Sequence, residues 1–229
     1  MSETVEHDPP LAAPRKSAVM REAGAIREIP RLLHQLFSWN DLPRGDAAIV
    51  TFPGFGTGDA FLSPLRAGLR RLGHDTSGWG LGRNRGDVAA ILPDAIDVIE
   101  NRAGRVGPVS LVGWSLGGVF AREIARDRPD LVDAVFTFGT PVVGGPRFTR
   151  SARHYGEQRM SEIDDVALVR EVHAIERPIT AFHSRRDAVV DWRACIDHTS
   201  PHVANIEVRS THVGMTIDPD VWSGIASRL

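Results

Sequence analysis

Short apolar runs alternate with longer amphipathic stretches along most of the chain. The runs are rich in Val, Ile, Phe and Ala; they span 47–52, 109–113, 132–137 and 179–183, with a weaker one at 206–208. Runs of this length and composition are typical of strands buried within a parallel sheet. A further strand is expected within 74–82, which runs into a glycine-rich turn.

The stretches between these runs carry apolar residues at helical spacing. They span 60–72, 87–102, 116–126 and 219–229, and the first of them ends at Gly73. Strands that are separated by helices in this way predict right-handed crossover connections. The sequence therefore predicts an α/β fold, with a doubly wound, mostly parallel sheet and helices on both faces.

A tail and a helical arm are predicted ahead of this domain. Residues 1–17 contain three prolines among small and charged residues, which is typical of a disordered tail. Helix-forming residues dominate from 17 to 39, and an interruption is expected at Pro30. We therefore expect the tail and the N-terminal helical arm in residues 1–46 and one α/β domain in residues 47–229.

The composition excludes several classes of chemistry. The chain has 229 residues, of which 42% are apolar and 24% are charged, as in a soluble globular protein. Lys16 in the predicted tail is the only lysine, so Schiff-base chemistry and a phosphate-binding P-loop lysine are excluded. Cys195 is the only cysteine, which excludes an intramolecular disulfide and a cysteine-based zinc finger.

Charge and hydropathy limit the partners and the compartment. The net charge is −2 and no basic block indicates a nucleic-acid surface. The first thirty residues lack the layout of a signal peptide, and no apolar run approaches the roughly 18 residues of a membrane helix. We expect a cytoplasmic protein with no integral membrane segment, and the oligomeric state is left open.

Neither a metal site nor a dinucleotide cofactor is predicted. No H-E-x-x-H motif is present. Two glycine-rich runs begin like the G-x-G-x-x-G fingerprint, but Asp59 and Arg83 stand where its last glycine is required. We therefore expect no cofactor.

The strongest signal is a serine between a predicted strand and a predicted helix. Strand 109–113 leads into Gly113-Trp114-Ser115-Leu116-Gly117, a G-x-S-x-G sequence in the context that this motif requires. Small residues on both sides allow the strand and the helix to pass closely, so the tight turn exposes the serine hydroxyl above the sheet. Ser115 is therefore the predicted nucleophile.

A serine nucleophile needs a base and an acid that orients the base. Where a serine lies on such a turn, the acid and then the histidine follow it in the chain. His212 comes just after the last predicted strand and is the predicted base. Asp187 comes in the turn directly after strand 179–183 and is the predicted acid, with Asp191 as the alternative.

The backbone N–H of Leu116 and that of Phe55 are the predicted oxyanion donors. Leu116 directly follows the nucleophile, and Phe55 lies in the glycine-rich loop after the first strand. Trp114, beside the nucleophile, is expected to line the substrate pocket or to pack under it. Trp79 lies in a cluster with Arg83 and Arg85 after the second strand and is a second substrate-binding candidate; a surface turn is the alternative interpretation.

These motifs resemble those of the α/β-hydrolase superfamily, and most closely those of small bacterial lipase- and esterase-like serine hydrolases. The resemblance covers residues 47–229 and rests on four motifs: the serine turn, the Pro53-Gly54-Phe55 loop, Ser184-x-x-Asp187-x-Val189-Val190 and His212-x-Gly214-Met215. It implies a Ser-Asp-His triad and acyl substrates. The chain departs from the lipase pattern at Pro53, where those enzymes usually have a histidine.

The resemblance also gives a role to 144–177, which departs from the alternation of strands and helices. This stretch is polar at first and helix-like from 157 to 175. Related hydrolases carry a lid or cap there, so a small helical cap over an acyl pocket is expected. A long surface connection is the alternative.

The sequence thus predicts a serine hydrolase of esterase or lipase type. Its small-molecule substrate is expected to be a carboxylic ester with a hydrophobic acyl or alcohol part, cleaved through an acyl-enzyme on Ser115. An acyl thioesterase or an acyltransferase with the same triad is the alternative. A catalytically silent member of the fold, acting as a binding protein, is an alternative of another class.

Overall fold

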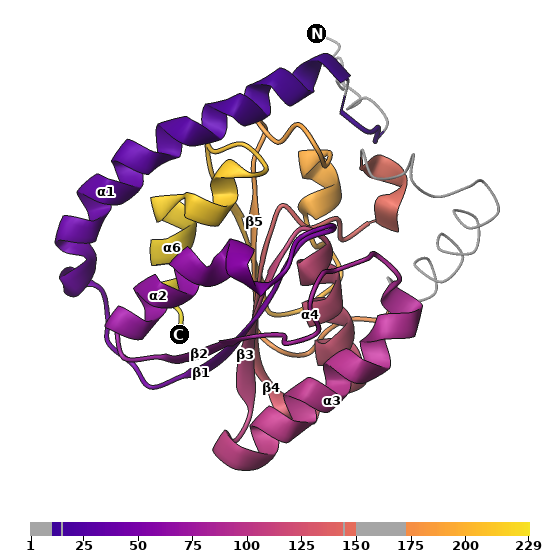
Figure 1. Cartoon of the computed structure of the whole chain (residues 1–229). Coiled ribbons are helices and arrows are strands. Elements are labelled where there is room, and N and C mark those ends of the chain that lie inside the picture. Colours follow the sequence, from indigo (N-terminus) through magenta and orange to yellow (C-terminus); the bar gives the residue numbers. More distant parts are fainter. Residues whose placement is uncertain (1–10, 15, 144, 150–172) are drawn as a thin grey trace, which may run out of the picture.

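A single parallel sheet forms the centre of the molecule. The computed structural model describes residues 11–14, 16–143, 145–149 and 173–229. Within these residues, six strands pair in the order β2-β1-β3-β4-β5-β6, and every neighbouring pair is parallel (Figure 1). The strands are β1 Ala48–Phe52, β2 Asp75–Gly78, β3 Val109–Trp114, β4 Val132–Phe138, β5 Ile179–His183 and β6 Val203–Glu207. The predicted parallel α/β sheet is confirmed.

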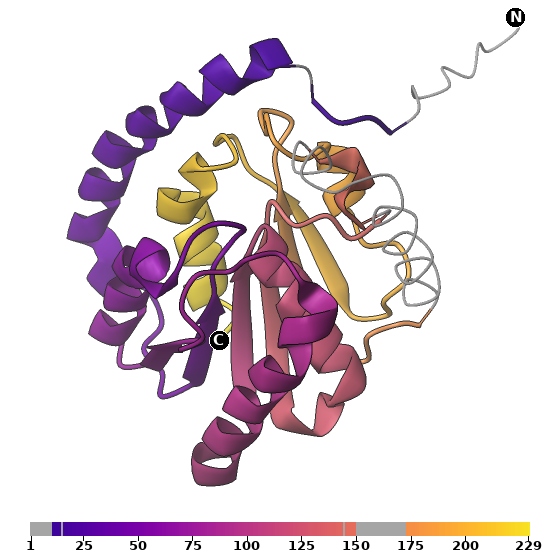
Figure 2. The same cartoon turned by 45° about the vertical axis from the view of Figure 1, so that its right-hand side comes forward.

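Helices cover both faces of the sheet, as predicted. On one face lie α1 Glu28–Ser38, α2 Ser63–Arg71 and α6 Pro219–Ala226; on the other lie α3 Val88–Val106 and α4 Leu116–Asp127 (Figures 1 and 2). Successive strand residues point into two separate hydrophobic cores. Ile49 lies in the core between the sheet and the helices α2 and α6, and Val50 lies in the core between the sheet and the helices α3 and α4. The sheet is therefore packed on both faces, and this close packing holds the ends of its strands in position.

Short 3₁₀ helices fill several of the connections. They are η3 Asp59–Leu62, η4 Pro129–Leu131, η5 Gly145–Phe148, η7 Trp192–Cys195 and η8 Gly214–Ile217. The strand order reverses between β1 and β3, because β1 pairs with β2 on one side and with β3 on the other. In open parallel sheets such a switch point opens a crevice at the carboxyl ends of the strands, where ligands bind.

The prediction for the last strand was wrong in position. The apolar run indicated 206–208, whereas β6 begins at Val203 and ends at Glu207. β6 is an edge strand, and Ala204, Asn205 and Glu207 are exposed. An exposed edge strand has little need for apolar residues, so its hydropathy signal is weak.

The N-terminal arm is helical, but it is built differently from the prediction. A 3₁₀ helix, η1 Lys16–Arg27, runs directly into α1, and η2 Trp39–Asp41 ends the arm. Pro30 does not interrupt it, since it lies in the first turn of α1, where proline is tolerated. The buried indole of Trp39 donates to the carbonyl of Gly68 (2.9 Å) and anchors the end of the arm to α2.

Some predictions fall on residues that the structure does not describe. Most of the tail, residues 1–10 and 15, lies outside the described residues, and so do residue 144 and residues 150–172 of the expected cap. The cap and the division of the chain at residue 46 stay predictions. No helix in the described part of the chain is both long enough and apolar enough to cross a membrane.

Candidate active site

Ser115 occupies a strained turn between β3 and α4. Its φ of 55° is the only positive φ at a non-glycine position among the described residues. A Cβ at Gly113 would collide with the backbone of Gly118, and one at Gly117 with the carbonyls of Phe52 and Pro53. The glycines predicted to flank the serine are therefore required, because strand and helix approach too closely for any side chain. Strain of this kind clusters at functional sites.

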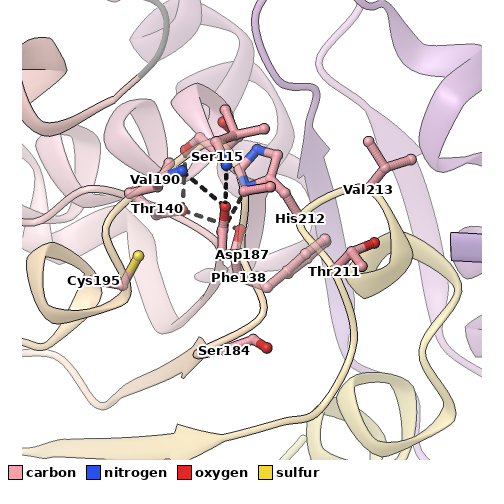
Figure 3. A network of polar contacts seen from close by, with 12 residues as sticks. Ser115, Phe138, Thr140, Ser184, Asp187, Val190, Cys195, Thr211, His212 and Val213 are labelled. Atoms are coloured by element: carbon pink, nitrogen blue, oxygen red, sulfur yellow. Dashed lines mark hydrogen bonds and ion pairs between the residues drawn. The ribbon is translucent and has the colours of Figure 1, made fainter. Parts of the chain in front are cut away.

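Asp187 and His212 meet across two loops. Asp187 follows β5 and His212 follows β6, and His212 Nδ1 donates to Asp187 Oδ2 at 2.7 Å (Figure 3). The other oxygen, Oδ1, accepts the backbone N–H groups of Val189 (2.7 Å) and Val190 (2.8 Å). The carboxylate is therefore fixed in orientation, and it holds the imidazole in the tautomer that leaves Nε2 as an acceptor.

Ser115 and His212 lie at the same turn after β4. The backbone N–H of Ser115 donates to the carbonyl of Phe138 (2.9 Å), and the hydroxyl of Thr140 donates to the carbonyl of Ser115 (3.0 Å). Gly139 lies between Phe138 and Thr140 and has a φ of 60°. A Cβ at Gly139 would lie 2.9 Å from Nδ1 of His212. The turn after β4 thus brings the serine, the histidine and the aspartate together (Figure 3).

The charges near His212 favour its protonated form. Burial lowers the pKa of His212, but the charge of Asp187, the hydrogen bond to it and the charge of Glu22 together raise the pKa above its ordinary value. A histidine in this setting is a stronger base, and the imidazolium formed on proton uptake is stabilised.

Asp191, the alternative acid, is engaged elsewhere. Its side chain bonds the guanidinium of Arg193 (2.7 Å) and caps η7 through the backbone N–H of Arg193 (3.1 Å). Burial raises the pKa of Asp191, but these hydrogen bonds and one from the N–H of Ala12 lower it below its ordinary value. Asp187, rather than Asp191, is the carboxylate that the structure brings to His212.

Cys195 is kept in its neutral thiol form. It is buried, and burial together with the charges of Asp187 and Asp191 raises the pKa of its thiol well above the ordinary value. The thiolate, which is the reactive form, is therefore disfavoured.

The loop that carries Phe55 lies against the serine turn. A Cβ at Gly54 would lie 2.7 Å from the Trp114 ring and 3.3 Å from Cβ of Ser115. Asn84 holds this loop in place through two hydrogen bonds. Its side-chain amide donates to the backbone carbonyl of Pro53 (2.8 Å), and its backbone carbonyl accepts the N–H of Gly56 (2.7 Å). Leu116 begins α4, and the first backbone N–H groups of a helix have no partner within the helix itself.

Aromatic side chains line one side of this region. Trp114 is buried, donates from its indole to the carbonyl of His212 (3.1 Å) and stacks on Phe61 with ring centroids 4.7 Å apart. Phe61 and Phe55 are each 38% exposed. Phe61 was missed by the sequence reasoning, since only its helical apolar face gave a signal.

Trp79 lies away from this group. It is 1% exposed, and its ring packs edge-on against Phe52 and Phe120 in the core on the α3 and α4 side. Its indole donates to the carbonyl of Gly82 (3.0 Å), within its own turn. The structure therefore gives Trp79 a packing role, with almost no surface left for a substrate to contact.

No metal site accompanies these residues in the described part of the chain. No group of three or more His, Cys, Asp or Glu side chains there is arranged to hold an ion.

Comparison with solved structures identifies the fold. A metagenome-derived lipolytic enzyme of the LipS and LipT pair superposes with a TM-score of 0.61, at 15% identity over 82% of this chain and 93% of its own. Alpha/beta hydrolase domain-containing protein 10 from mouse gives a TM-score of 0.58, at 19% identity over 82% and 89% of the two chains. The chain has the α/β-hydrolase fold.

Comparison of the sequence alone does not identify the fold. No protein-family model and no curated protein matches the sequence. The monoacylglycerol lipase of Paleococcus ferrophilus is a further structural neighbour, with a TM-score of 0.56, 17% identity and coverage of 81% of this chain and 93% of its own. The resemblance based on the motifs is thus confirmed for the fold.

Proposed function

We propose that this α/β-hydrolase-fold protein is a serine hydrolase that cleaves a carboxylic ester through an acyl-enzyme on Ser115. The observation that carries the proposal is the hydrogen bond between Asp187 and His212, made beside the one serine of the described chain that lies in a strained, left-handed turn. A passive serine would not need this turn, a buried base and an orienting acid at the same place.

The proposed reaction has two halves. The hydroxyl of Ser115 attacks the acyl carbonyl while Nε2 of His212 takes its proton, and the carbonyl oxygen becomes an oxyanion. The N–H groups of Leu116 and Phe55 are the proposed donors to that oxyanion. His212 then gives its proton to the leaving alkoxide, which departs as an alcohol and leaves the acyl group on Ser115.

Water completes the cycle. A water molecule takes the place of the alcohol, His212 removes its proton, and the hydroxide equivalent attacks the acyl-enzyme. The carboxylic acid leaves, and the proton returns through His212 to Ser115. Asp187 keeps its charge throughout and stabilises the imidazolium that appears in both halves.

The aromatic surface near Trp114 supports a substrate with a hydrophobic part. Phe61 stacks on Trp114, and both Phe61 and Phe55 leave more than a third of their surface exposed close to the serine turn. Apolar pockets with a few convergent polar groups are typical of small-molecule sites. We expect the acyl or the alcohol part of the ester to contact these two phenylalanines.

The proposal is tested with a panel of p-nitrophenyl esters of increasing acyl length, assayed beside matched acyl thioesters. Wild-type protein is expected to hydrolyse the esters, and Ser115→Ala to lose on the order of 10⁶ in kcat. Ser227→Ala, an exposed serine at the end of α6, is the matched control and should behave as wild type. A higher kcat/KM for thioesters would assign a thioesterase instead, and turnover equal to that of Ser115→Ala would leave a silent member of the fold.

A further inference from the structure

The N-terminal arm reaches the loops that carry the proposed acid and base. Glu22, in η1, accepts three backbone hydrogen bonds with its carboxylate: Oε1 from Ala188 (3.1 Å) and His212 (3.2 Å), and Oε2 from Val213 (2.9 Å). Ala188 follows Asp187 directly, and Val213 follows His212. One side chain from the arm is therefore bonded to both loops at once.

These contacts span the chain. Glu22 is separated from Ala188 by 166 positions and from Val213 by 191. The arm also packs beside the histidine loop at Gly24, where an added Cβ would lie 3.6 Å from Cγ2 of Thr211. The two loops leave different strands, β5 and β6, and Glu22 contributes a link between them in addition to the bond between Asp187 and His212.

We infer that Glu22 is a positioning residue of the active site, whose carboxylate fastens the acid loop to the histidine loop and adds a negative charge next to the base. The inference rests on the proposed function. Its geometric basis is the set of three backbone N–H groups, from two loops, that donate to one carboxylate. Hydrogen bonds to a charged acceptor are stronger than those to a neutral one. A carboxylate that takes three of them from two loops restricts how far His212 and Asp187 can move apart.

The charge of Glu22 also acts on the imidazole. Two carboxylates face His212, Asp187 from the acid loop and Glu22 from the arm, and after the lowering effect of burial both raise the pKa of His212. Cys195, near Asp187, is kept as a neutral thiol by its burial. Without the charge of Glu22, the pKa of His212 is expected to be lower and the imidazolium of the transition state less stable.

Two substitutions of Glu22 separate the effect of its hydrogen bonds from the effect of its negative charge. Glu22→Gln keeps one oxygen that can accept from Ala188 and His212 but removes the charge, whereas Glu22→Ala removes both. We expect kcat to fall about 10-fold in Glu22→Gln and about 100-fold in Glu22→Ala, with KM little changed. The acidic limb of the pH profile should move to lower pH in both variants, since neither retains the charge.

The readout is the rate at which a fluorophosphonate labels Ser115, measured across the pH range in which histidine titrates, together with ester turnover and thermal unfolding. Glu100→Gln is the matched charge control, because Glu100 is an exposed carboxylate on α3. Arg31→Gln is the control for the arm: it removes the ion pairs of Arg31 with Asp220 (2.7 Å), Asp218 (3.7 Å) and Glu28, and it leaves Glu22 intact. Both controls should keep the wild-type pH profile.

The failures of the two hypotheses are distinguishable. If wild-type Ser115 is not labelled, the proposed function fails. If it is labelled and Glu22→Gln retains both the wild-type rate and the wild-type pH profile, only the role of Glu22 is overturned. A lowered melting temperature with an unmoved acidic limb in both variants would also overturn it, because Glu22 would then only hold the arm.

Discussion

At the scale of single residues, the contact between Asp187 and His212 distinguishes two nearby carboxylates. Asp187→Asn keeps the shape of the side chain but no longer favours the tautomer with Nδ1–H, so kcat is expected to fall about 10⁴-fold. Asp191→Asn is the matched control, since Asp191 bonds Arg193 and η7 instead of the imidazole. Steady-state ester hydrolysis by the two variants measures the difference, and a crippled Asp191→Asn with an active Asp187→Asn would reverse the assignment.

The ionisation of His212 sets a pH dependence. The base must be neutral to accept the proton of Ser115, so activity is expected to rise with pH as His212 loses its proton. Its folded pKa is raised, so the rise should be centred above the value of about 6.5 for an unperturbed histidine. The profile of kcat/KM against pH measures it; a midpoint below that of free histidine would contradict the balance of charges described for His212.

The same raised pKa affects stability in the opposite direction. A group with a raised folded pKa binds its proton more tightly in the folded state. The stabilisation from protonated His212 is therefore complete at low pH and is lost as pH rises through the folded pKa. The proposed active form, with neutral His212, therefore lacks the stabilisation that protonated His212 contributes.

The residues of the candidate site differ in how well the sequence predicts them. Ser115, Asp187 and His212 follow from a local motif and from chain order, and the structure brings the three together at the turn after β4. Trp79 was proposed from its place after a strand, but its burial depends on Phe52 and Phe120, which sequence position does not reveal. Glu22 had no signal at all, because its partners lie more than 160 positions away.

At the scale of elements, the apolar runs predicted the bounds of strands well where both faces of the strand are buried. β5 has the predicted bounds, and β1, β3 and β4 differ from prediction by a residue at one end. The exposed edge strand β6 was misplaced for lack of an apolar pattern. The 3₁₀ form of η1 was also not predicted, since the same residues favour an ordinary helix by composition.

The close approach of β1 and α4 gives a prediction for the serine turn. A Cβ at Gly117 meets the carbonyl of Phe52, which is backbone and cannot move aside cheaply, so Gly117→Ala should destabilise by about 1–3 kcal/mol or more. Gly104→Ala is the matched control: Gly104 lies in α3 with nothing within 4 Å of an added Cβ. That change should stabilise by about 0.5–1 kcal/mol.

Denaturant unfolding compares the two glycine variants. Equal effects would mean that the strand and the helix do not approach as closely at Gly117 as described. Fluorophosphonate labelling of folded Gly117→Ala should also be slower, because the turn must shift to admit the methyl group.

At the scale of the whole molecule, a buried ion pair joins α4 to the connection between β5 and β6. Arg122 in α4 and Asp197, between β5 and β6, pair at 2.8 Å, and their side chains are 4% and 0% exposed. Burial raises the pKa of Asp197, but Arg122 and the hydrogen bonds from Arg122 and Ser200 lower it below its ordinary value. Its stabilisation is therefore present above the ordinary carboxylate range and is lost as pH falls.

Removing this pair should destabilise the fold as a whole. Asp197→Ala leaves the Arg122 charge buried without Asp197 and is expected to cost about 3–5 kcal/mol. Asp130→Ala is the matched control, since Asp130 pairs with Arg128 at the surface, where little change is expected. Thermal unfolding at neutral and acidic pH measures both; the loss in Asp197→Ala should shrink toward acidic pH, and equal melting temperatures at neutral pH would contradict the prediction.

The proposed function requires that Ser115 is a nucleophile activated by His212. The most direct measurement is to treat the folded protein with a fluorophosphonate and to locate the adduct by peptide mass spectrometry. We expect one adduct per chain, on Ser115, which disappears on heat denaturation and becomes far slower to form in His212→Ala. No adduct on the folded wild type, or an adduct that persists in Ser115→Ala, would show that Ser115 is not the nucleophile.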